Sequence, residues 1–527
     1  MFYDPASNIL VYDTKEPLVI ASACPDARQL NNGYVGVPAS LRNLQALTAK
    51  GLPVNAPMDR DYDWPGPYKP FRAQNITANF LAVNPRAFVL SDMGTGKTLA
   101  ALWAADYVMS HYPPGTCRAI IASPLSTLRR VWSDAIFQAL LGRRTCVVLH
   151  GDAKRRERLL EQPADFYIIN HDGLGVGASV NRKVELRGFA AALAAREDIK
   201  IAIVDECSAY RDPSTNRHKI ARIMLMPRPY LWMMTGTPTP NGPTDAYGQA
   251  KLVNNAYGEA LTSYRLRVMQ NVSQFKWVPK PGAHEAARKM MSPAVRFAIE
   301  DCVDLPECTV QRRDAELSKE QTDKFKEMKR DLRVQMKNGE NITAVNEGVL
   351  RWKLLQIVCG AIYDSNKDFH TIDASPRLTV LKEVIEQANE KIIIFAPLTS
   401  VLHMLHKELV KAGHSVAMVN GEVSYGKRSE IFGLFQSSKE PRIIVADPGT
   451  MSHGLTLTAA TMIIWYAPTD KTEVYLQANK RIHRPGQVKT TTIVQIAASP
   501  IEREIYKRLE NNESMQGLVL KLVEEEK

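Results

Sequence analysis

The sequence lacks the cysteine pattern of a disulfide framework or a zinc site. Its seven cysteines are scattered along 527 residues, their number is odd, and none forms a C-x-x-C pair. Disulfide frameworks and structural zinc sites need paired or closely spaced cysteines. The pattern therefore indicates free thiols in a reducing compartment, and the cytoplasm is the expected location.

Long hydrophobic runs are missing as well. No uninterrupted apolar stretch approaches the ~18 residues that a membrane span requires, and residues 1–5 lack the basic and apolar regions of a signal peptide. Low-complexity tails and short tandem repeats are not found either. With 45% hydrophobic and 23% charged residues, the composition is that of a globular protein, and 527 residues are too many for one core. We therefore expect at least two globular domains.

Acidic residues are fewer than basic ones, which gives a formal net charge of +11. A surplus of lysine and arginine occurs on many solvated surfaces. It is also what a polyanionic partner requires, because these side chains neutralise phosphates. Charge alone leaves both interpretations open, and nucleic acid becomes the favoured partner only beside motifs that point to it.

The first 70 residues predict a small α+β module and a linker. Short apolar runs at 9–12 and 18–21 are typical of strands, and leucines at three-residue spacing predict a helix over 38–50. A Pro- and Asp-rich stretch at 53–70 then favours a linker. We treat residues 1–70 as an accessory module.

The rest of the chain alternates strand and helix patterns in two stretches. Residues 71–255 predict a first α/β lobe and residues 371–527 a second, separated by a charged, mostly helical insertion at 256–370. Continuous apolar runs are typical of parallel strands covered on both faces. The expected strands are 87–90, 118–122, 145–149, 166–169, 201–204 and 230–234 in the first lobe, and 391–395, 442–445, 462–465 and 491–496 in the second, where helices are expected at 376–389, 398–412 and across 500–525. The predicted fold class is α/β, with two parallel-sheet lobes.

One of these strands leads into a glycine-rich turn that opens a helix. This order aims backbone N–H groups and the positive end of the helix at one point, which suits a phosphate. Lys97 supplies a cation for the β- and γ-phosphates of a nucleotide, and the Thr98 hydroxyl can bind Mg²⁺. The strict phosphate-loop pattern, G-x-x-x-x-G-K-[ST], would place a glycine where this sequence has Ser91. The expected ATP-binding residues of the turn are Asp92, Met93, Gly94, Thr95, Gly96, Lys97 and Thr98.

Two acids follow the apolar run that ends at Val204. In a nucleotide-binding lobe, Asp205 at a strand end can hold Mg²⁺ through its water shell. Glu206 can then orient and deprotonate the attacking water. In isolation the pair is better explained as an acidic turn after a strand. Its position downstream of the phosphate turn favours the catalytic role.

Another strand ends in the polar turn Thr235-Gly236-Thr237-Pro238. A rigid turn of hydroxyls, glycine and proline can relay the state of a γ-phosphate to neighbouring elements. By itself the turn is ordinary. Its position in the sequence after the two acids is what indicates a functional role.

A basic segment of the second lobe contains Gln477, Arg481 and Arg484. The two arginines are three residues apart, so on a helix they share one face. Two guanidinium groups presented in this way can clamp transferring phosphate oxygens. A solvated basic helix end is the alternative, and the Pro-Gly stop that follows favours a defined helix terminus.

Together these segments resemble motifs I, II, III and VI of superfamily-two helicases and, among them, the Swi/Snf family of DNA translocases. The resemblance covers about residues 71–510 and rests mainly on the phosphate turn, on Thr235-Gly236-Thr237-Pro238, and on Arg481-x-x-Arg484-x-Gly486-Gln487. It implies that ATP with Mg²⁺ binds between two RecA-like lobes. The catalytic residues it implies are Lys97, Asp205, Glu206, Gln477, Arg481 and Arg484.

The resemblance also assigns residues that we would otherwise interpret as connections after strands. Gln74 matches the adenine-reading Q motif, and Gly454 is implied as an ATP contact of the second lobe. Motifs Ia, Ic, III, IV and V imply contacts to nucleic acid. These are Pro124, Leu125, Ser126, Thr127, Asn170, His171, Thr235, Gly236, Thr237, Pro397, Thr450 and Thr456.

Three positions depart from the usual patterns. Motif II continues with Cys207-Ser208 and lacks the usual final histidine, Thr456 stands where asparagine is typical, and Ser91 replaces the first glycine of the strict loop, as it does in the family's own version. The first departure puts the usual coupling between ATPase and nucleic acid in doubt. None removes the lysine, the acids or the arginines, so we expect an active ATPase.

The resemblance implies a nucleic-acid-stimulated ATPase of the helicase and translocase class. The expected function is a monomeric motor on double-stranded DNA that remodels forks, branches or recombination intermediates. Single-stranded or branched DNA is an alternative partner, and no membrane is expected. A strand-separating DNA or RNA helicase is the first alternative function, and a catalytically degenerate DNA-binding recruitment protein the second. The lack of a chromatin-reading module favours a compact bacterial or phage-encoded member, in the bacterial or host cytoplasm.

Overall fold

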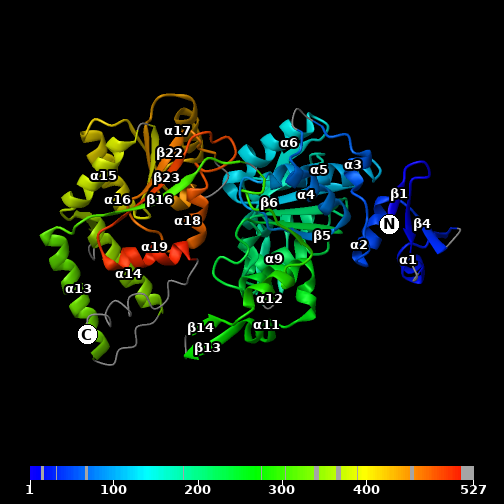
Figure 1. Ribbon diagram of the computed structural model, residues 1–527, viewed down its shortest axis with the longest axis horizontal. Helices are drawn as coiled ribbons and strands as arrows, with labels where there is room; N and C mark the ends of the chain where they lie inside the picture. The colour runs from blue at the N-terminus through cyan, green and yellow to red at the C-terminus, as the bar shows by residue number, and fades with distance from the viewer. Residues whose placement is uncertain are drawn as a thin grey trace. The chain divides into compact units, whose positions relative to one another are not determined.

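The computed structural model describes all residues except 14–16, 31–32, 66–68, 182, 274–275, 303, 338–343, 364–368, 389, 452–455 and 512–527. The chain forms two compact units, Met1–Cys302 and Val303–Lys527 (Figure 1). Each unit is built around its own parallel sheet. None of the helices in the described part of the chain has the length and hydrophobicity to span a bilayer.

A small α+β module begins unit 1. Its antiparallel sheet has the strand order β1-β2-β4-β3, and Leu10, Val37 and Leu44 are buried in its core. The expected strand at 18–21 is wrong, because these residues lie in a helix that buries Ile20 and exposes Leu18. A short apolar run does not separate the two structures by itself. The elements are β1 Phe2–Asp4, β2 Ile9–Asp13, α1 Pro17–Ala23, β3 Arg28–Gln29, β4 Tyr34–Pro38 and α2 Leu41–Ala49.

The stretch after this module is fastened to unit 1. It contains the short helix α3 (Pro57–Asp61), whose Met58 is fully buried. The Tyr62 hydroxyl donates to a carboxylate oxygen of Asp106 at 2.8 Å, and the rings of Trp64 and Trp103 meet edge to face at 5.3 Å. The described residues of the expected linker therefore pack on the helix that follows the phosphate turn.

A seven-stranded sheet with the order β15-β5-β12-β11-β6-β8-β7 forms the centre of unit 1. Every pairing in it is parallel. The six strands expected from apolar runs are present, and the two-residue β15 is too short to produce a pattern. The strands are β5 Arg86–Val89, β6 Arg118–Ser123, β7 Cys146–Val148, β8 Phe166–Asn170, β11 Ile199–Asp205, β12 Tyr230–Met234 and β15 Ala294–Val295.

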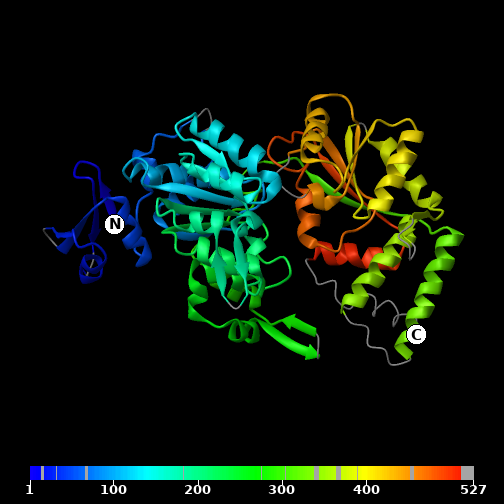
Figure 2. The same ribbon diagram turned by 180° about the vertical axis from the view of Figure 1, so that it is seen from behind.

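Helices cover both faces of this sheet (Figures 1 and 2). Alternate strand residues face opposite cores, so Val89 joins the cluster around Trp103 while Phe88 joins the cluster around Tyr210. The helices of unit 1 beyond α3 are α4 Arg72–Val83, α5 Lys97–Ser110, α6 Asp134–Leu140, α7 Ala153–Glu161, α8 Gly188–Ala194, α9 Asn216–Met224, α10 Asp245–Val253, α11 Leu261–Val268 and α12 Ala283–Met290.

Short elements connect these helices and strands. They are the 3₁₀ turns η2 Leu125–Thr127, η4 His171–Gly175, η5 Cys207–Tyr210 and η6 Asn255–Gly258, the π-helical segment η3 Leu128–Ser133, and the hairpins β9 Ala178–Val180 with β10 Val184–Leu186 and β13 Met269–Ser273 with β14 Lys276–Pro279. The stretch expected as a helical insertion therefore includes a hairpin.

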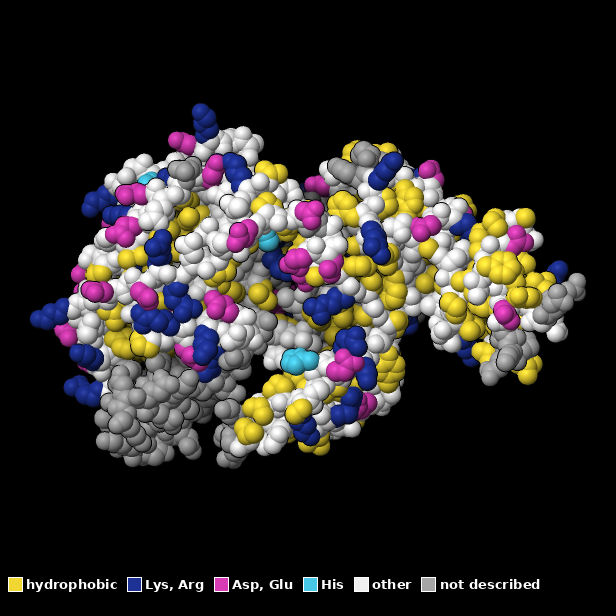
Figure 3. Space-filling model, in the orientation of Figure 1, with side chains coloured by type: hydrophobic (Ala, Val, Ile, Leu, Met, Phe, Trp, Pro, Cys, Tyr) yellow, Lys and Arg dark blue, Asp and Glu magenta, His cyan; other side chains and the backbone are white. Residues whose placement is uncertain are grey.

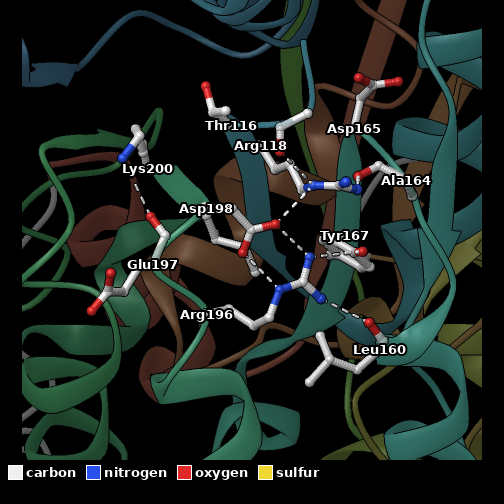
Figure 4. A network of polar contacts seen from close by, with 12 residues as sticks. Thr116, Arg118, Leu160, Ala164, Asp165, Tyr167, Arg196, Glu197, Asp198 and Lys200 are labelled. Atoms are coloured by element: carbon white, nitrogen blue, oxygen red, sulfur yellow. Dashed lines mark hydrogen bonds and ion pairs between the residues drawn. The ribbon is translucent and has the colours of Figure 1, made fainter. Parts of the chain in front are cut away.

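The amino ends of three central strands are joined by a polar network (Figure 4). Asp198 accepts from Arg196 at 2.7 Å and pairs with Arg118 at 2.8 Å, and Arg196 also donates to the Tyr167 hydroxyl at 3.1 Å. Burial alone would raise the pKa of Asp198, but the hydrogen bond from Arg196 and the two positive charges outweigh it and lower the pKa. This network stabilises the amino ends of the strands, opposite to the carboxyl ends where the phosphate turn and the two acids lie.

Unit 2 contains a six-stranded parallel sheet with the order β16-β23-β22-β19-β21-β20. Four of its strands follow the predicted apolar runs, whereas β16 and β20 were not predicted, because most of β16 is exposed and β20 is only half-buried. The strands are β16 Cys308–Asp314, β19 Lys391–Phe395, β20 Val416–Val419, β21 Ile443–Ala446, β22 Ala460–Trp465 and β23 Thr491–Ala497.

The helices of unit 2 include the expected ones. The last expected helical stretch begins with α19, and residues 512–527 lie outside the described residues. The elements are α13 Lys319–Lys337, α14 Ala344–Cys359, α15 Ser375–Gln387, α16 Thr399–Lys411, α17 Tyr425–Ser437, η7 Pro448–Met451, α18 Thr472–Asn479 and α19 Pro500–Glu510, with a small hairpin of β17 Ala361–Tyr363 and β18 Phe369–Thr371.

A fully buried ion pair joins α15 to α19. Arg377 and Glu502 are 0% exposed, and their side chains meet at 2.7 Å. The other oxygen of Glu502 accepts from the backbone N–H and the hydroxyl of Ser499, which caps α19. Removing one partner leaves the other charge buried without compensation, which costs about 3–5 kcal/mol.

We therefore expect Glu502→Ala to lower the free energy of unfolding of unit 2 by about 3–5 kcal/mol. Urea unfolding of the full chain, followed by circular dichroism, measures this loss. Glu390 forms a surface ion pair with Lys489 and provides a matched control. Glu390→Ala should change the stability by less than about 1 kcal/mol. Equal midpoints for the two variants would contradict the expectation.

Candidate active site

The glycine-rich turn after β5 wraps around the end of the Lys97 side chain. Gly94 and Gly96 have φ of +90° and +78°, a region that other residues rarely adopt. Lys97 begins α5, and its Nζ donates to the carbonyl oxygens of Ser91 and Asp92, both at 2.7 Å. The ammonium group thus lies within the turn, at the positive end of a 14-residue helix. This arrangement suits an anion such as a phosphate.

Ser91 is buried and serves as an acceptor. Its Oγ accepts a hydrogen bond from the backbone N–H of Phe297 at 3.0 Å. The backbone N–H groups of Leu90 and Asp92 donate to the carbonyls of Val295 and Phe297, each at 2.9 Å. The segment that contains β15 therefore runs alongside β5 and fixes the start of the turn.

Gln74 lies directly against the turn. It is 3% exposed on α4, and its Oε1 accepts from the N–H of Phe71 at 2.9 Å. A Cβ atom on Gly96 would lie 2.0 Å from the Gln74 Nε2, so a larger residue there would displace the end of the Gln74 side chain, in addition to straining the backbone at this φ. Thr95 closes the turn through a bond from its Oγ1 to the Asp92 carbonyl at 2.8 Å. The half-buried Thr98 follows Lys97 in the first turn of α5.

The two acids lie at the carboxyl end of β11 with different partners. Asp205 accepts a hydrogen bond from the indole Nε1 of Trp132 at 3.1 Å. Burial raises the pKa of Asp205, and the indole hydrogen bond and the charge of Lys97 counter this rise. Glu206 has a φ of +52°, and its Oε2 accepts from the Thr235 hydroxyl at 3.1 Å. Such strained backbone is common at functional sites.

The third residue of motif II forms a link to the motif III turn. Cys207 is fully buried, and burial and the charges of Glu206 and Asp205 raise the pKa of its thiol. The protonated Sγ donates to the Oε1 of Gln249 at 3.0 Å. The Nε2 of Gln249 in turn donates to the Pro238 carbonyl at 2.6 Å. Acids and turn are thus connected by two routes, one through Thr235 and one through Gln249.

The motif III turn lies between the phosphate turn and the acids, because β12 lies between β5 and β11. Thr235 is fully buried and donates its N–H to the Val89 carbonyl at 3.1 Å, and its Oγ1 accepts from the N–H of Thr237. A Cβ on Gly236 would lie 3.2 Å from the Met93 side chain. Thr235 was predicted to contact nucleic acid. In the structure its hydroxyl donates a hydrogen bond to the Glu206 carboxylate.

Other predicted contacts lie at the same sheet edge. Residues 124–127 follow β6, where the Thr127 hydroxyl donates to the Pro124 carbonyl at 2.8 Å and Leu125 is exposed. Asn170 ends β8 and accepts from Arg156 at 3.2 Å. The next residue, His171, is buried and contacts the Tyr210 hydroxyl at 3.0 Å. Ser126 is half-buried beside Leu125.

In unit 2, the predicted residues of motifs IV and V follow neighbouring strands. Pro397 comes two residues after β19 ends, and Thr450 lies in η7, where its hydroxyl donates to the Asp447 carbonyl at 2.7 Å. Thr456 is exposed. Gly454 lies outside the described residues, so its role stays a prediction.

The motif VI arginines are not on a helix. Helix α18 ends at Asn479, and both Arg481 and Arg484 lie in the turns that follow. Arg481 is fully buried, and its carbonyl accepts from the N–H of Leu457 at 3.0 Å. Gln487 holds these turns together, since its Nε2 donates to the Ile482 carbonyl at 3.0 Å and to two carbonyls around β22. The helix predicted from the spacing is wrong at these arginines, because α18 ends six residues before Pro485.

Gln477 lies on α18 itself. It is 1% exposed, and its Nε2 donates to the Glu473 carboxylate at 3.2 Å. Gln477 lies near the end of α18, and Arg481 follows only two residues after the helix ends at Asn479. The functional role of all three side chains stays a prediction.

Sequence comparison decides the family. A sequence model of the SNF2-related domain matches residues 81–363, which is more than half of the chain. The chain belongs to the SNF2-related family. A model of the helicase conserved C-terminal domain matches residues 376–486 of the same SNF2-related chain. Together, the matches cover the sheet of unit 1, five of the six strands of the unit 2 sheet and most of the motif segments described above, whereas β23, Gln74 and Gln487 lie outside them.

Curated relatives of this SNF2-related chain are distant. A SWI/SNF-related matrix-associated actin-dependent regulator of chromatin subfamily A-like protein 1 of Xenopus laevis is 23% identical over 82% of this chain and 42% of that protein. An ATP-dependent helicase of Mycoplasma genitalium is 24% identical over 83% of this chain and 40% of that protein. The DNA annealing helicase and endonuclease ZRANB3 of Bos taurus is 22% identical over 82% of this chain and 38% of that protein. The chain spans about two fifths of the length of these relatives.

A solved Sulfolobus solfataricus SWI2/SNF2 ATPase core in complex with dsDNA is 18% identical over 85% of this chain and 92% of that chain, with a TM-score of 0.38. At this TM-score the similarity adds no argument. The fold is defined by the two parallel sheets themselves.

Proposed function

We propose that the chain is an ATP-driven motor that moves along double-stranded DNA and remodels DNA or protein–DNA structures. One observation carries the proposal: the phosphate turn, the two acids and the motif III turn lie at one edge of a parallel sheet and are joined by direct contacts. Glu206 and Thr235 meet at 3.1 Å, and Gly236 lies against Met93 of the phosphate turn. The family and the curated helicase relatives support this function.

In this proposal, the turn from Asp92 to Thr98 holds the phosphates of ATP. The left-handed glycines leave the backbone open to the phosphates, and the α5 dipole favours negative charge there. Lys97 supplies a cation to the β- and γ-phosphates. Gln74, whose side chain lies against Gly96, is assigned the reading of the adenine.

Thr98 and Asp205 would hold Mg²⁺. Magnesium bound with a nucleotide takes most of its ligands from water and phosphates, and needs only one or two from the protein. The oxygen donors of these two residues fit that requirement. When bound, the ion neutralises charge on the β- and γ-phosphates. The indole of Trp132 orients the Asp205 carboxylate by a hydrogen bond at 3.1 Å.

Hydrolysis is assigned to Glu206 and to the motif VI arginines. Glu206 orients and deprotonates the attacking water, and the Thr235 hydroxyl fixes its carboxylate. Arg481 and Arg484 stabilise negative charge on the transferring phosphate, assisted by Gln477. Because the acids and the motif III turn share two hydrogen-bonded routes, a change at the phosphate reaches the turn directly.

The ATPase rate with different nucleic acids tests this function. We expect strong stimulation by duplex DNA at fixed low salt, and weaker stimulation by single-stranded DNA and RNA. Stimulation by single strands or RNA alone would favour a strand-separating helicase. No turnover under any condition would favour a degenerate DNA-binding protein.

A further inference from the structure

The hairpin β13–β14 stands apart from both large sheets of the structure. It forms a two-stranded antiparallel sheet of its own. In unit 1 it extends beyond the helices α11 and α12 that precede and follow it (Figures 1 and 2). A two-stranded hairpin is marginally stable in water by itself. Its orientation therefore depends on its base, and we refer to residues 261–290, from α11 to α12, as the arm.

The base of the arm is firmly anchored. Tyr264 is fully buried and donates its hydroxyl to the Pro243 carbonyl at 2.8 Å. Lys280 closes the hairpin, because its N–H donates to the Val268 carbonyl at 2.9 Å and its Nζ to the Leu266 carbonyl at 2.6 Å. These bonds hold the two strands in a fixed direction relative to the core of unit 1.

At the base, an arginine of α11 is stacked on a tryptophan of the hairpin. The guanidinium carbon of the exposed Arg265 lies 4.2 Å from the ring centre of the half-buried Trp277. Stacking fixes the plane of the guanidinium and leaves its N–H groups available at the edge. A planar, preoriented set of donors of this kind matches a phosphate group. Asn271 pairs with Trp277 across the hairpin and adds a polar side chain.

The hairpin carries exposed apolar surface and a bulge. The pairing register shifts between Asn271 and Ser273, which leaves Val272 as an extra residue with 50% of its surface exposed. Leu266 is 60% exposed on α11. Bulges increase the twist of a strand and are frequent beside functional sites. Exposed apolar groups at these positions do not contribute to a core, but they can contact sugars.

The arm is strongly basic. It contains six Lys or Arg residues and one acidic residue, Glu285, which pairs with Arg288 and Lys289. Arg267 pairs with Glu259, just before the arm. Hydrophobic and basic side chains lie side by side along it (Figure 3). This combination fits a polyanion that also offers apolar groups, and a duplex groove about 12 Å wide admits a two-stranded ribbon.

We propose that the arm binds the sugar–phosphate backbone of duplex DNA, with Arg265 on a phosphate and Trp277 holding Arg265 in place. The inference rests on the proposed function and names a contact surface for it in unit 1. Binding through phosphates is independent of sequence, and it weakens with salt because each contact releases counterions.

Arg265→Ala and Trp277→Ala test the arm. We expect each to weaken binding of a labelled mixed-sequence duplex about tenfold, and Arg265→Ala to reduce the slope of log affinity against log salt by about one. ATP turnover without DNA should remain unchanged. Trp277→Phe keeps an aromatic ring and should stay near wild type. Arg187, an exposed arginine paired with Glu185, supplies the control Arg187→Ala, which should leave duplex affinity unchanged.

The outcomes separate this inference from the proposed function. If wild type binds duplex DNA and is stimulated by it, but Arg265→Ala and Trp277→Ala bind as tightly as wild type, the arm proposal is wrong and the motor stands. If the two variants lose affinity for single strands only, the surface is a single-strand platform and the duplex assignment is overturned. If wild type responds to no nucleic acid, both proposals fail.

Discussion

Glu206→Gln should lower ATP turnover by about 10³-fold, within the range of a positioned general base. Glutamine has nearly the same shape and can still accept the hydrogen bond that the Thr235 hydroxyl donates at 3.1 Å. It cannot accept the proton of the attacking water. ATP affinity and duplex affinity should therefore remain close to wild type, because the phosphate turn and the arm are unchanged. Steady-state phosphate release, with binding of a fluorescent ATP analogue, measures both properties.

Glu197 offers a matched control for this variant. It is exposed and precedes β11, whereas Glu206 follows the carboxyl end of the same strand. Glu197→Gln should leave turnover unchanged. Wild-type turnover in Glu206→Gln would contradict the assignment of the general base, even with normal binding.

Arg484→Ala should also reduce turnover by about 10³-fold, the effect of removing an arginine that stabilises the transferring phosphate. ATP affinity should change little, because the phosphate turn of unit 1 supplies most ground-state contacts. Arg484 is more informative than Arg481. The Arg481 side chain is fully buried, so its removal would mix an effect on folding with an effect on catalysis.

Arg503→Ala provides the control for Arg484→Ala. Arg503 lies on α19 and bonds Asp314 at 2.8 Å, away from the motif VI segment. We expect its turnover to equal that of wild type. If Arg484→Ala retained full turnover while its melting temperature matched wild type, the arginine would have no part in hydrolysis.

The sequence predicted the fold because its strands are strongly patterned. The runs ending at Leu90, Val204 and Met234 are continuous and apolar, as parallel strands covered on both faces require. The phosphate turn follows β5 and the acids lie at the end of β11, and because the sheet is parallel both lie at the carboxyl ends of its strands. The family was predicted from the same motifs and is confirmed.

Contacts between distant segments could not be predicted. Trp132 bonds Asp205 across 73 positions, and Gln249 joins Cys207 to Pro238 across 42 and 11. Single tryptophans and glutamines inside helical segments carry no local signal of such partners. The Cys207–Gln249 hydrogen bond lies next to Ser208, the residue at which motif II lacks its usual histidine.

The predicted secondary structure was wrong at the motif VI arginines and at residues 18–21. Three-residue spacing indicates a shared face only if the segment is helical, and α18 ends before Arg481. At 18–21 a short apolar run fits strand and helix equally well. Four residues are too few to distinguish the 3.6-residue period of a helix from the two-residue period of a strand.

Displacement of a third strand from triplex DNA tests the central claim most directly, since a motor that moves along a duplex removes the third strand without unpairing the duplex itself. We predict ATP-dependent displacement by the wild type and none by Glu206→Gln, while the underlying duplex stays paired. Separation of the duplex strands, or turnover of ATP without displacement, would contradict a double-stranded DNA translocase.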